Sequence, residues 1–326
     1  MTPSADLRVL FRAPAGARRG FGHVVRCLSL ARALGVRPLI ALRGSRQARH
    51  AALRLGADLI ASPAVAAIAA LKPDVVVIDD PVSADARRWI RAARKAGALA
   101  VTMHDLGLGC HDADLRIDGS LTRAASGARA LSGPRYAVLD PSLRDAGAAY
   151  QAAGRRSTVL IALGGGPHTR RAESIASRIV RANPDAEVQI AAGFVSPAGA
   201  GSLRRRAHDR VRWIGPQRGL ARALANASIA VVGGGVSLYE ACALGVPAVT
   251  MPVVAGQRPT VRAFARLGAA QAVGGGTRAA ADAALALLAD RTAQRGLARR
   301  GRRLIDGRGA ARAANAVAVL AAGRAS

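Results

Sequence analysis

Short runs of Val, Leu and Ile alternate with longer segments in which apolar residues recur at helical spacing along the chain. This alternation is typical of parallel α/β units, in which each buried strand is followed by a helix that covers the sheet. In the first half it predicts strands at Leu7–Phe11, Pro38–Leu42, Asp58–Ala61, Val75–Ile78, Leu99–Met103 and Leu115–Asp118. In the second half it predicts strands at Thr158–Leu163, Glu187–Ala191, Val211–Ile214, Ile229–Val232, Ala248–Met251 and Gln271–Val273.

A polar stretch separates the two sets of strands. Residues 139–156 contain Pro141 and no strand pattern, so they are the best candidate for a linker. The length of 326 residues also fits two domains of about 150 residues each. We therefore predict two Rossmann-like domains, 1–150 and 151–326, that face each other across a cleft. The Ala- and Arg-rich end predicts helices broken at Gly301 and at Gly307–Gly309, the last helix packing back on the first domain.

Composition narrows the class of protein. Hydrophobic residues make up 51% of the chain but aromatic residues only 3%, so the cores consist mainly of aliphatic side chains and a disordered chain is excluded. No apolar run reaches the roughly 18 residues of a membrane-spanning helix, and the first ten residues lack a signal-peptide pattern. The three cysteines, at wide spacings, fit neither a disulfide framework nor a zinc site. We expect a cytoplasmic protein without a metal.

The chain is strongly basic. It has 48 basic and 20 acidic residues, a net charge of +28. The basic residues are scattered along the whole chain instead of forming a tail, which argues against specific recognition of nucleic acid. The charge balance instead predicts attraction to an anionic ligand or to an anionic membrane surface.

The first candidate motif begins with two glycines at the start of a helical pattern. Gly20 and Gly22 permit a tight turn, and the apolar spacing that follows places His23 in the first turn of a helix. The positive end of the helix dipole there favours an anionic ligand and a neutral imidazole. The alternative is a histidine that only caps or packs the start of the helix.

Two glycine triplets follow predicted strands, Gly164–Gly166 and Gly233–Gly235. Consecutive glycines at a strand end expose backbone N–H groups that suit a diphosphate. The alternative for the first triplet is a flexible turn in which Thr169 caps the next helix. After the second triplet, Ser237 is a candidate helix cap. Glu240 lies about one turn into that helix, where its carboxylate accepts hydrogen bonds from a ribose diol or pairs with the helix dipole.

Further polar residues end predicted strands or begin helices. Asp79 and Asp80 follow one strand, and His104 and Asp105 follow another. They are candidate contacts for sugar hydroxyls or a cation, and the alternative is turn formation or capping. Gln257 is a ligand contact or simply a residue at the start of a helix. The sequence contains no cluster with metal-ligand spacing and indicates no cofactor.

Seven segments, in order from residue 7 to about 313, carry a resemblance to a known family. The segments are GFGHVVRCLSLARAL, VVVIDD, HDLGLGCHDADLRIDGS, YAVLDPSLR, LIALGGG, IAVVGGGVSLYEACALGVPAV with Gln257 following, and LIDGRGAAR. On these segments the chain resembles the nucleotide-sugar hydrolases of pseudaminic acid biosynthesis and the related spore-coat polysaccharide proteins, which are similar to the N-acetylglucosamine transferase of peptidoglycan synthesis. The resemblance implies the GT-B glycosyltransferase fold.

The resemblance also implies roles for individual residues. His23 activates or positions the attacking water, and Gly22 lies near the phosphates. Glu240 binds the ribose, and Gln257 lines the cleft. The remaining nucleotide contacts are glycines that hold the diphosphate and backbone that reads the uracil, namely Gly164, Gly165, Gly166, Gly233, Gly234, Gly235, Trp213 and Ile214, with Ser237 beside them.

The implied activity is hydrolysis of a UDP-activated amino or deoxy sugar at its anomeric C–O bond. The alternatives are a glycosyltransferase of the same fold and a non-catalytic protein that binds sugar nucleotides. The chain departs from the family after its first strand, where Arg12–Pro14 replace a stretch with an acidic residue. It departs again at Pro81, which replaces an aromatic residue, and at Pro167–His168, which replace Ser–Asp. These changes fall on the sugar side of the implied site and near the phosphates.

Overall fold

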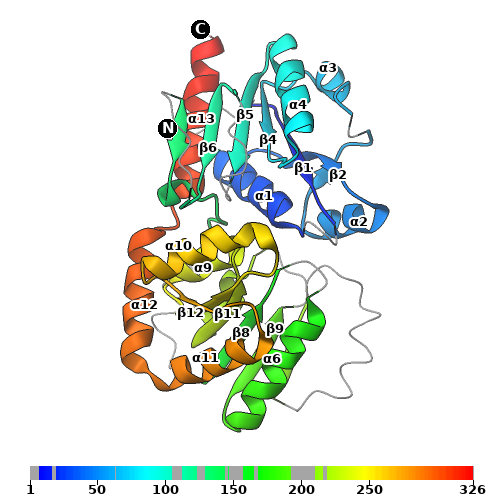
Figure 1. Ribbon diagram of the computed structural model, residues 1–326. Helices are drawn as coiled ribbons and strands as arrows, with labels where there is room; N and C mark the ends of the chain where they lie inside the picture. Colours follow the sequence, from blue (N-terminus) through cyan, green and yellow to red (C-terminus); the bar gives the residue numbers. More distant parts are fainter. Residues whose placement is uncertain are drawn as a thin grey trace. The chain divides into compact units, whose positions relative to one another are not determined.

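The computed structural model describes residues 7–16, 20–62, 64–104, 112–122, 129–143, 146, 157–164, 168–191, 210–215 and 219–325. The chain forms two compact units (Figure 1). One contains the chain up to Pro141, apart from a short segment around Gly20, together with Gly307–Ser326. The other contains Ser142–Asp306. Each unit is built on one parallel sheet.

The first unit has a seven-stranded sheet in the order β3-β2-β1-β4-β5-β6-β7. Its strands are β1 (Val9–Pro14), β2 (Leu39–Arg43), β3 (Asp58–Leu59), β4 (Val75–Ile78), β5 (Leu99–His104), β6 (Leu115–Asp118) and β7 (Ala130–Ser132). Its helices are α1 (Gly22–Leu34), α2 (Arg46–Arg54), α3 (Ala67–Leu71), α4 (Ser83–Lys95), the 3-10 turn η1 (Pro134–Tyr136) and α13 (Gly309–Ala325).

The second unit has a six-stranded sheet in the order β10-β9-β8-β11-β12-β13. Its strands are β8 (Thr158–Ala162), β9 (Glu187–Ala191), β10 (Val211–Ile214), β11 (Ile229–Gly233), β12 (Ala248–Met251) and β13 (Gln271–Ala272). Its helices are α6 (Thr169–Ala182), α8 (Ala221–Ala225), α9 (Val236–Leu244), the 3-10 turn η2 (Ala255–Gln257), α10 (Arg258–Arg266), α11 (Thr277–Ala289) and α12 (Arg291–Leu304).

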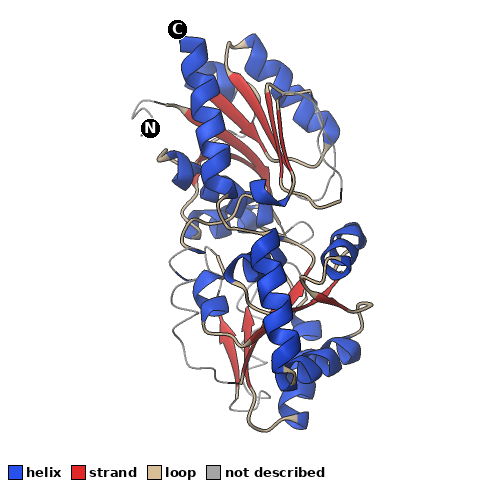
Figure 2. Cartoon of the chain, turned by 90° about the vertical axis from the view of Figure 1, so that its left-hand side faces the viewer, coloured by secondary structure: helices blue, strands red, loops and turns tan. Residues whose placement is uncertain are grey.

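The pattern of apolar runs predicted the strands well. Every predicted strand is present with shifts of a few residues, and the central strands β4, β5, β8 and β11 are buried along their whole length. Buried runs of this kind are expected when helices cover both faces of a parallel sheet, an arrangement visible in Figure 2. Of the strands in the described residues, the one that the sequence missed is β7, a three-residue strand at the sheet edge whose residues are half-buried.

One prediction about the helices is wrong. Gly301 does not break a helix, because α12 continues through it to Leu304. A Cβ atom at Gly301 would lie 3.2 Å from the Cα atom of Cys242 on α9. Glycine at this position therefore allows close packing of α12 against α9. The chain does break at Gly307, which has a φ of 70°.

The last helix of the chain belongs to the first unit. It packs against α1, and its first residue, Gly309, lies against the turn η1. A Cβ atom at Gly309 would overlap the carbonyl oxygen of Ala137. No helix among the described residues is long and apolar enough to span a membrane.

We expect Gly309→Ala to lower the free energy of unfolding by about 1–3 kcal/mol, because backbone atoms around Ala137 must move to admit the methyl group. Gly323→Ala is the matched control on the same helix, since nothing lies within 4 Å of its Cβ position. The control should be neutral or stabilising by less than about 1 kcal/mol. Urea unfolding of the two variants measures the difference, and equal stabilities would refute the packing argument.

Candidate functional site

Each sheet reverses its direction of growth between two neighbouring strands. In the first unit this point lies between β1 and β4, and in the second between β8 and β11. Loops that leave these strands at their carboxyl ends diverge to opposite sides of the sheet, so a crevice for ligands forms there in such folds. The candidate residues His23 and Asp79 follow β1 and β4, and the two glycine triplets follow β8 and β11.

His23 lies in the first turn of α1, as predicted from the sequence. No side chain caps the beginning of this helix, and its first turn contains no acidic residue. The Nδ1 atom of His23 lies 2.7 Å from an Oδ1 atom of Asp79, directly after β4. The His23 side chain is 18% exposed and the Asp79 side chain 2%. The histidine therefore reaches solvent, while its carboxylate partner is buried.

Arg26 completes this cluster and was missed by the sequence analysis. Its Nε atom donates to Oδ2 of Asp79 at 2.8 Å, and Nη2 donates to Oδ1 at 2.7 Å. This two-bonded ion pair is buried and is the strong geometry for an arginine and a carboxylate. The spacing of three residues from His23 contained a signal, because residues i and i+3 share a helix face.

The electrostatics keep Asp79 ionised. Burial alone would raise the pKa of its carboxyl group, but Arg26 and His23 outweigh that effect through their charges and hydrogen bonds. They hold the pKa of Asp79 well below its usual range. Nδ1 of His23 lies 2.7 Å from Oδ1 of Asp79 and 2.9 Å from Nη2 of Arg26. In the tautomer whose Nδ1 donates to the ionised Asp79, Nε2 carries the lone pair and is the basic atom of the ring.

Asp80 belongs to a second, separate ion-pair network. Its carboxylate accepts from Nη2 of Arg43 at 2.6 Å and from the backbone N–H of Val82 at 3.0 Å. The guanidinium of Arg12 lies 3.5 Å from Asp80 and 5.1 Å from the centre of the Trp89 ring. Burial lowers the pKa of Arg12, an effect that Asp80 opposes. Arg12 lies where the sequence departs from the family pattern. Its guanidinium stabilises the buried carboxylate of Asp80, which follows β4.

In the second unit the triplet Gly233–Gly235 is held by Gln257. The side-chain oxygen of Gln257 accepts from the backbone N–H groups of Gly234 at 3.1 Å and Val253 at 3.0 Å. A Cβ atom at Gly234 would lie 2.6 Å from a methyl group of Val261. Gln257 therefore uses its carboxamide oxygen to fix the loop, and glycine is needed at position 234 for close packing.

The helix α9 begins directly after this triplet. Its N-cap is Gly235, so the expectation that Ser237 caps the helix is wrong, because Ser237 lies one residue inside α9. Glu240 lies beyond the first turn and is 3% exposed. The alternative role for Glu240 as an acid in the first turn is therefore wrong. Thr169 does not cap α6 either, since the N-cap there is His168.

The structure places the other predicted residues at the ends of further strands or directly after them. Gly164 follows β8 in a left-handed conformation, with a φ of 95°. Trp213 and Ile214 end β10, an edge strand of the second sheet. His104 ends β5 beside Asp118 of β6 and is buried. Gly165, Gly166 and Asp105 lie outside the described residues.

The described part of the chain contains no group of three or more His, Cys, Asp or Glu side chains that could hold a metal ion. Cys27 and Cys242 are buried free thiols, and Cys110 lies outside the described residues. Burial raises the pKa of Cys242 to about 12, and burial together with Asp79 raises the pKa of Cys27 well above its ordinary value. Both thiols therefore stay protonated and unreactive at neutral pH.

Known proteins resemble the chain over nearly its whole length. A spore coat polysaccharide biosynthesis protein, SpsG of Bacillus subtilis (strain 168), is 26% identical over 319 residues, which cover 91% of this chain and 94% of that protein. No protein-family model matches the chain.

Solved structures resemble it more in fold than in sequence. MurG of Acinetobacter baumannii has a TM-score of 0.64 and 14% identity, covering 95% of this chain and 99% of MurG. The UDP-GlcNAc 2-epimerase of Neisseria meningitidis, bound to UDP-GlcNAc, has a TM-score of 0.61 and 12% identity, covering 93% and 97%. The chain has the GT-B fold. This GT-B chain thus has the two parallel α/β units that its sequence predicted.

The depressed pKa of Asp79 predicts how stability depends on pH. Asp79→Asn leaves Arg26 buried without its anionic partner and should lower the free energy of unfolding by about 3–5 kcal/mol at neutral pH. Because the pKa of Asp79 is lower in the folded than in the unfolded chain, the contribution of its charge is complete above about pH 4 and falls as the pH drops below that value. The gap between wild type and variant should therefore narrow in acid.

Urea unfolding at neutral pH and at roughly pH 3 measures this gap. Asp185→Asn is the control, since Asp185 is exposed and its substitution should change stability by less than about 0.5 kcal/mol. A gap between wild type and Asp79→Asn that stays constant across this pH range would contradict the assignment.

Proposed function

We propose that this protein hydrolyses a UDP-activated sugar at its anomeric C–O bond and releases UDP, in the synthesis of a surface polysaccharide. The observation that carries the proposal is the buried Arg26–Asp79 ion pair, which holds His23 at the start of α1. A partly buried imidazole that still reaches solvent and is oriented by an ionised carboxylate is the arrangement expected of a general base. The similarity to SpsG supports the polysaccharide context.

In the proposed mechanism His23 acts on the attacking water. Its Nε2 atom takes a proton from the water while the water oxygen forms a bond to the anomeric carbon. The C–O bond to the diphosphate breaks, and its electron pair leaves on the terminal phosphate oxygen of UDP. Asp79 keeps Nδ1 protonated and stabilises the imidazolium that forms, as the carboxylate of a catalytic triad does. The imidazolium then releases its proton to solvent.

The second unit is proposed to hold the nucleotide. The N–H groups at the beginning of α9 and the positive end of its dipole favour a diphosphate beside Gly233–Gly235. Gln257 supports this role because its side-chain oxygen fixes the glycine loop through the N–H group of Gly234. Glu240 is proposed to accept hydrogen bonds from the ribose diol. The solved structure of a GT-B epimerase with UDP-GlcNAc supports a UDP-sugar as the ligand.

A glycosyltransferase is the second candidate, because the same base can deprotonate a sugar or lipid hydroxyl in place of water. Purified protein incubated with a panel of UDP-sugars, with and without candidate acceptors, separates the two activities. UDP release without acceptor supports the hydrolase. UDP release that requires an acceptor supports the transferase, and UDP binding without turnover under either condition overturns both.

His23→Ala should lower turnover by about 100- to 10,000-fold, the range for loss of one positioned proton-transfer group. UDP affinity should change little, because the proposed nucleotide contacts lie in the second unit. His50→Ala is the control, since His50 is exposed on α2. UDP release and UDP affinity are measured on the same preparations. Full turnover in His23→Ala would exclude the histidine as the base, and joint loss of turnover and UDP affinity would make it a binding or folding residue.

Glu240→Ala should weaken UDP binding by roughly 5- to 150-fold, because a buried ribose diol that loses its acceptor costs about 1–3 kcal/mol. Glu187→Ala removes an exposed carboxylate from β9 of the same unit and should leave the affinity unchanged. Calorimetric titration with UDP compares the variants, and circular dichroism checks that each is folded. Equal affinity in Glu240→Ala and wild type would refute the ribose contact.

A further inference from the structure

The helix α12 carries an unusual distribution of charge. Its 14 residues include six arginines and no acidic residue. All six are exposed, namely Arg291, Arg295, Arg299, Arg300, Arg302 and Arg303. The buried side of the helix is formed by Gln294, Leu297 and Gly301. At 100° per residue, Arg291, Arg295, Arg299 and Arg302 fall within a stripe about 80° wide that lies outside the arc of these buried residues.

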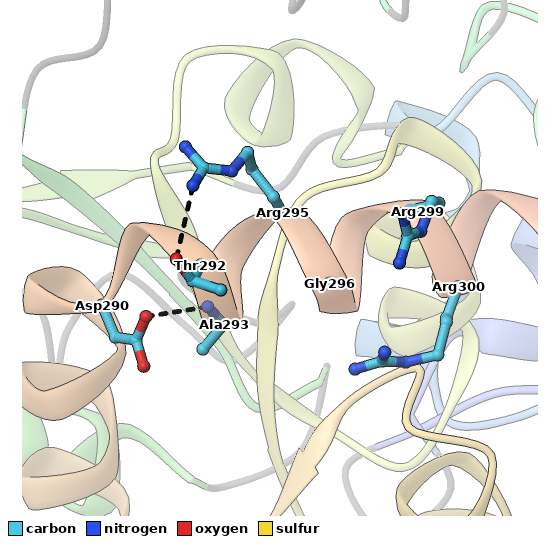
Figure 3. Close-up of a pocket in the computed structure, with 7 residues that line it drawn as sticks. All are labelled: Asp290, Thr292, Ala293, Arg295, Gly296, Arg299 and Arg300. Atoms are coloured by element: carbon cyan, nitrogen blue, oxygen red, sulfur yellow. Dashed lines mark hydrogen bonds between the residues drawn. The ribbon is translucent and has the colours of Figure 1, made fainter.

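The outer face of α12 is hollowed as well as basic. A groove of about 550 Å³ lies along the first part of the helix, lined by Asp290, Thr292, Ala293, Arg295, Gly296, Arg299 and Arg300 (Figure 3). Asp290 uses one carboxylate oxygen to cap the helix through the N–H of Ala293. Among the described residues Arg299 has no hydrogen-bond or ion-pair partner, so its guanidinium is available to an anion.

An exposed leucine is fixed beside this face. Nε of Arg300 donates to the carbonyl oxygen of Gly268 at 2.6 Å. Gly268 has a φ of 62°, and a Cβ atom there would lie 2.6 Å from that same nitrogen, so only glycine allows the contact. The preceding residue, Leu267, is 48% exposed and follows the exposed Arg266. The contact thus anchors an apolar side chain next to the arginines of α12.

We propose that this face of the second unit, formed by α12 and the Arg266–Gly268 turn, docks on a membrane leaflet rich in anionic phospholipid. Arginines along one helix attract a negatively charged surface, and a neighbouring exposed apolar side chain inserts among the acyl chains. The groove, which Arg295 and Arg299 both line, provides room for a lipid phosphate. This proposal does not depend on the proposed enzymatic activity.

A nucleic acid fits the same face less well. Binding to single strands relies on exposed aromatic side chains that stack on bases. In α10, α11 and α12 the one aromatic residue is Phe264, which is buried against Tyr239. A phosphate backbone offers no apolar surface to an exposed leucine, whereas transfer of this side chain from water into lipid is favourable. The observations therefore favour the membrane.

The test is sedimentation of the full-length protein with vesicles of equal parts phosphatidylglycerol and phosphatidylcholine, and with vesicles of phosphatidylcholine alone. We expect binding to the anionic vesicles only. Each arginine near the surface contributes roughly a fivefold change in affinity, so the double variant Arg295→Gln/Arg299→Gln should bind roughly 30-fold more weakly. Leu267→Ser should also weaken binding, and its effect should persist at high salt because it removes apolar contact.

The matched control is Arg87→Gln/Arg88→Gln, which removes two exposed arginines from α4 of the first unit. An equal loss in this control would show that total charge governs binding and would overturn the proposal. Competition by millimolar inorganic phosphate at constant ionic strength would instead indicate a discrete anion site. Binding to random-sequence DNA with the same sensitivity to the α12 variant would indicate a polyanion site, and absence of vesicle binding would also overturn the proposal.

Discussion

Parallel strand order is the constraint from which the rest of the structure follows. In a parallel sheet all strands end at the same edge, and each return connection must cross a face, so helices cover both faces. The reversal between β1 and β4, and again between β8 and β11, leaves a gap between diverging loops. His23 and Asp79 meet across the first reversal although 56 residues separate them in the chain. The glycine loop before α9 occupies the equivalent position in the second unit.

Arginine side chains pair with buried carboxylates of the first unit. Arg26 neutralises the buried Asp79, while Arg43 and Arg12 do the same for Asp80. Arg32 pairs with Asp140 at the end of the first unit's main segment. A guanidinium suits these positions because it stays charged when buried and presents several donors in a fixed plane. A basic composition is therefore partly a structural property, and only arginines without such partners are available to ligands.

The cores contain few aromatic side chains, and their helices approach one another closely. With only 3% aromatic residues, the chain brings its helices together through small side chains. Gly301 lies on the backbone of Cys242 between α12 and α9, and Gly309 lies on Ala137 between α13 and η1. Such contacts depend on the absence of a Cβ atom, because a methyl group would crowd Cys242 at position 301 and would overlap the backbone of Ala137 at position 309. The glycines of the chain thus serve packing as much as they serve turns.

The sequence alone determined the strands apart from β7, the first turn that contains His23 and the glycine loop before α9, because each depends on local periodicity or on local turn chemistry. Tertiary structure decided what those local elements do. Gly301 has the sequence signature of a helix break, yet packing against Cys242 keeps it inside α12. The sequence offered Gln257 as a ligand contact. In the structure its side-chain oxygen accepts hydrogen bonds from two backbone N–H groups, that of Gly234 in another loop and that of Val253 in its own loop. From the sequence, Arg26 was only a residue of a predicted helix. The fold places Asp79 against it. Hydrogen bonds between distant segments have no period in the sequence, so the partners of His23, Asp80 and Gln257 emerged only when the sheets brought those segments together.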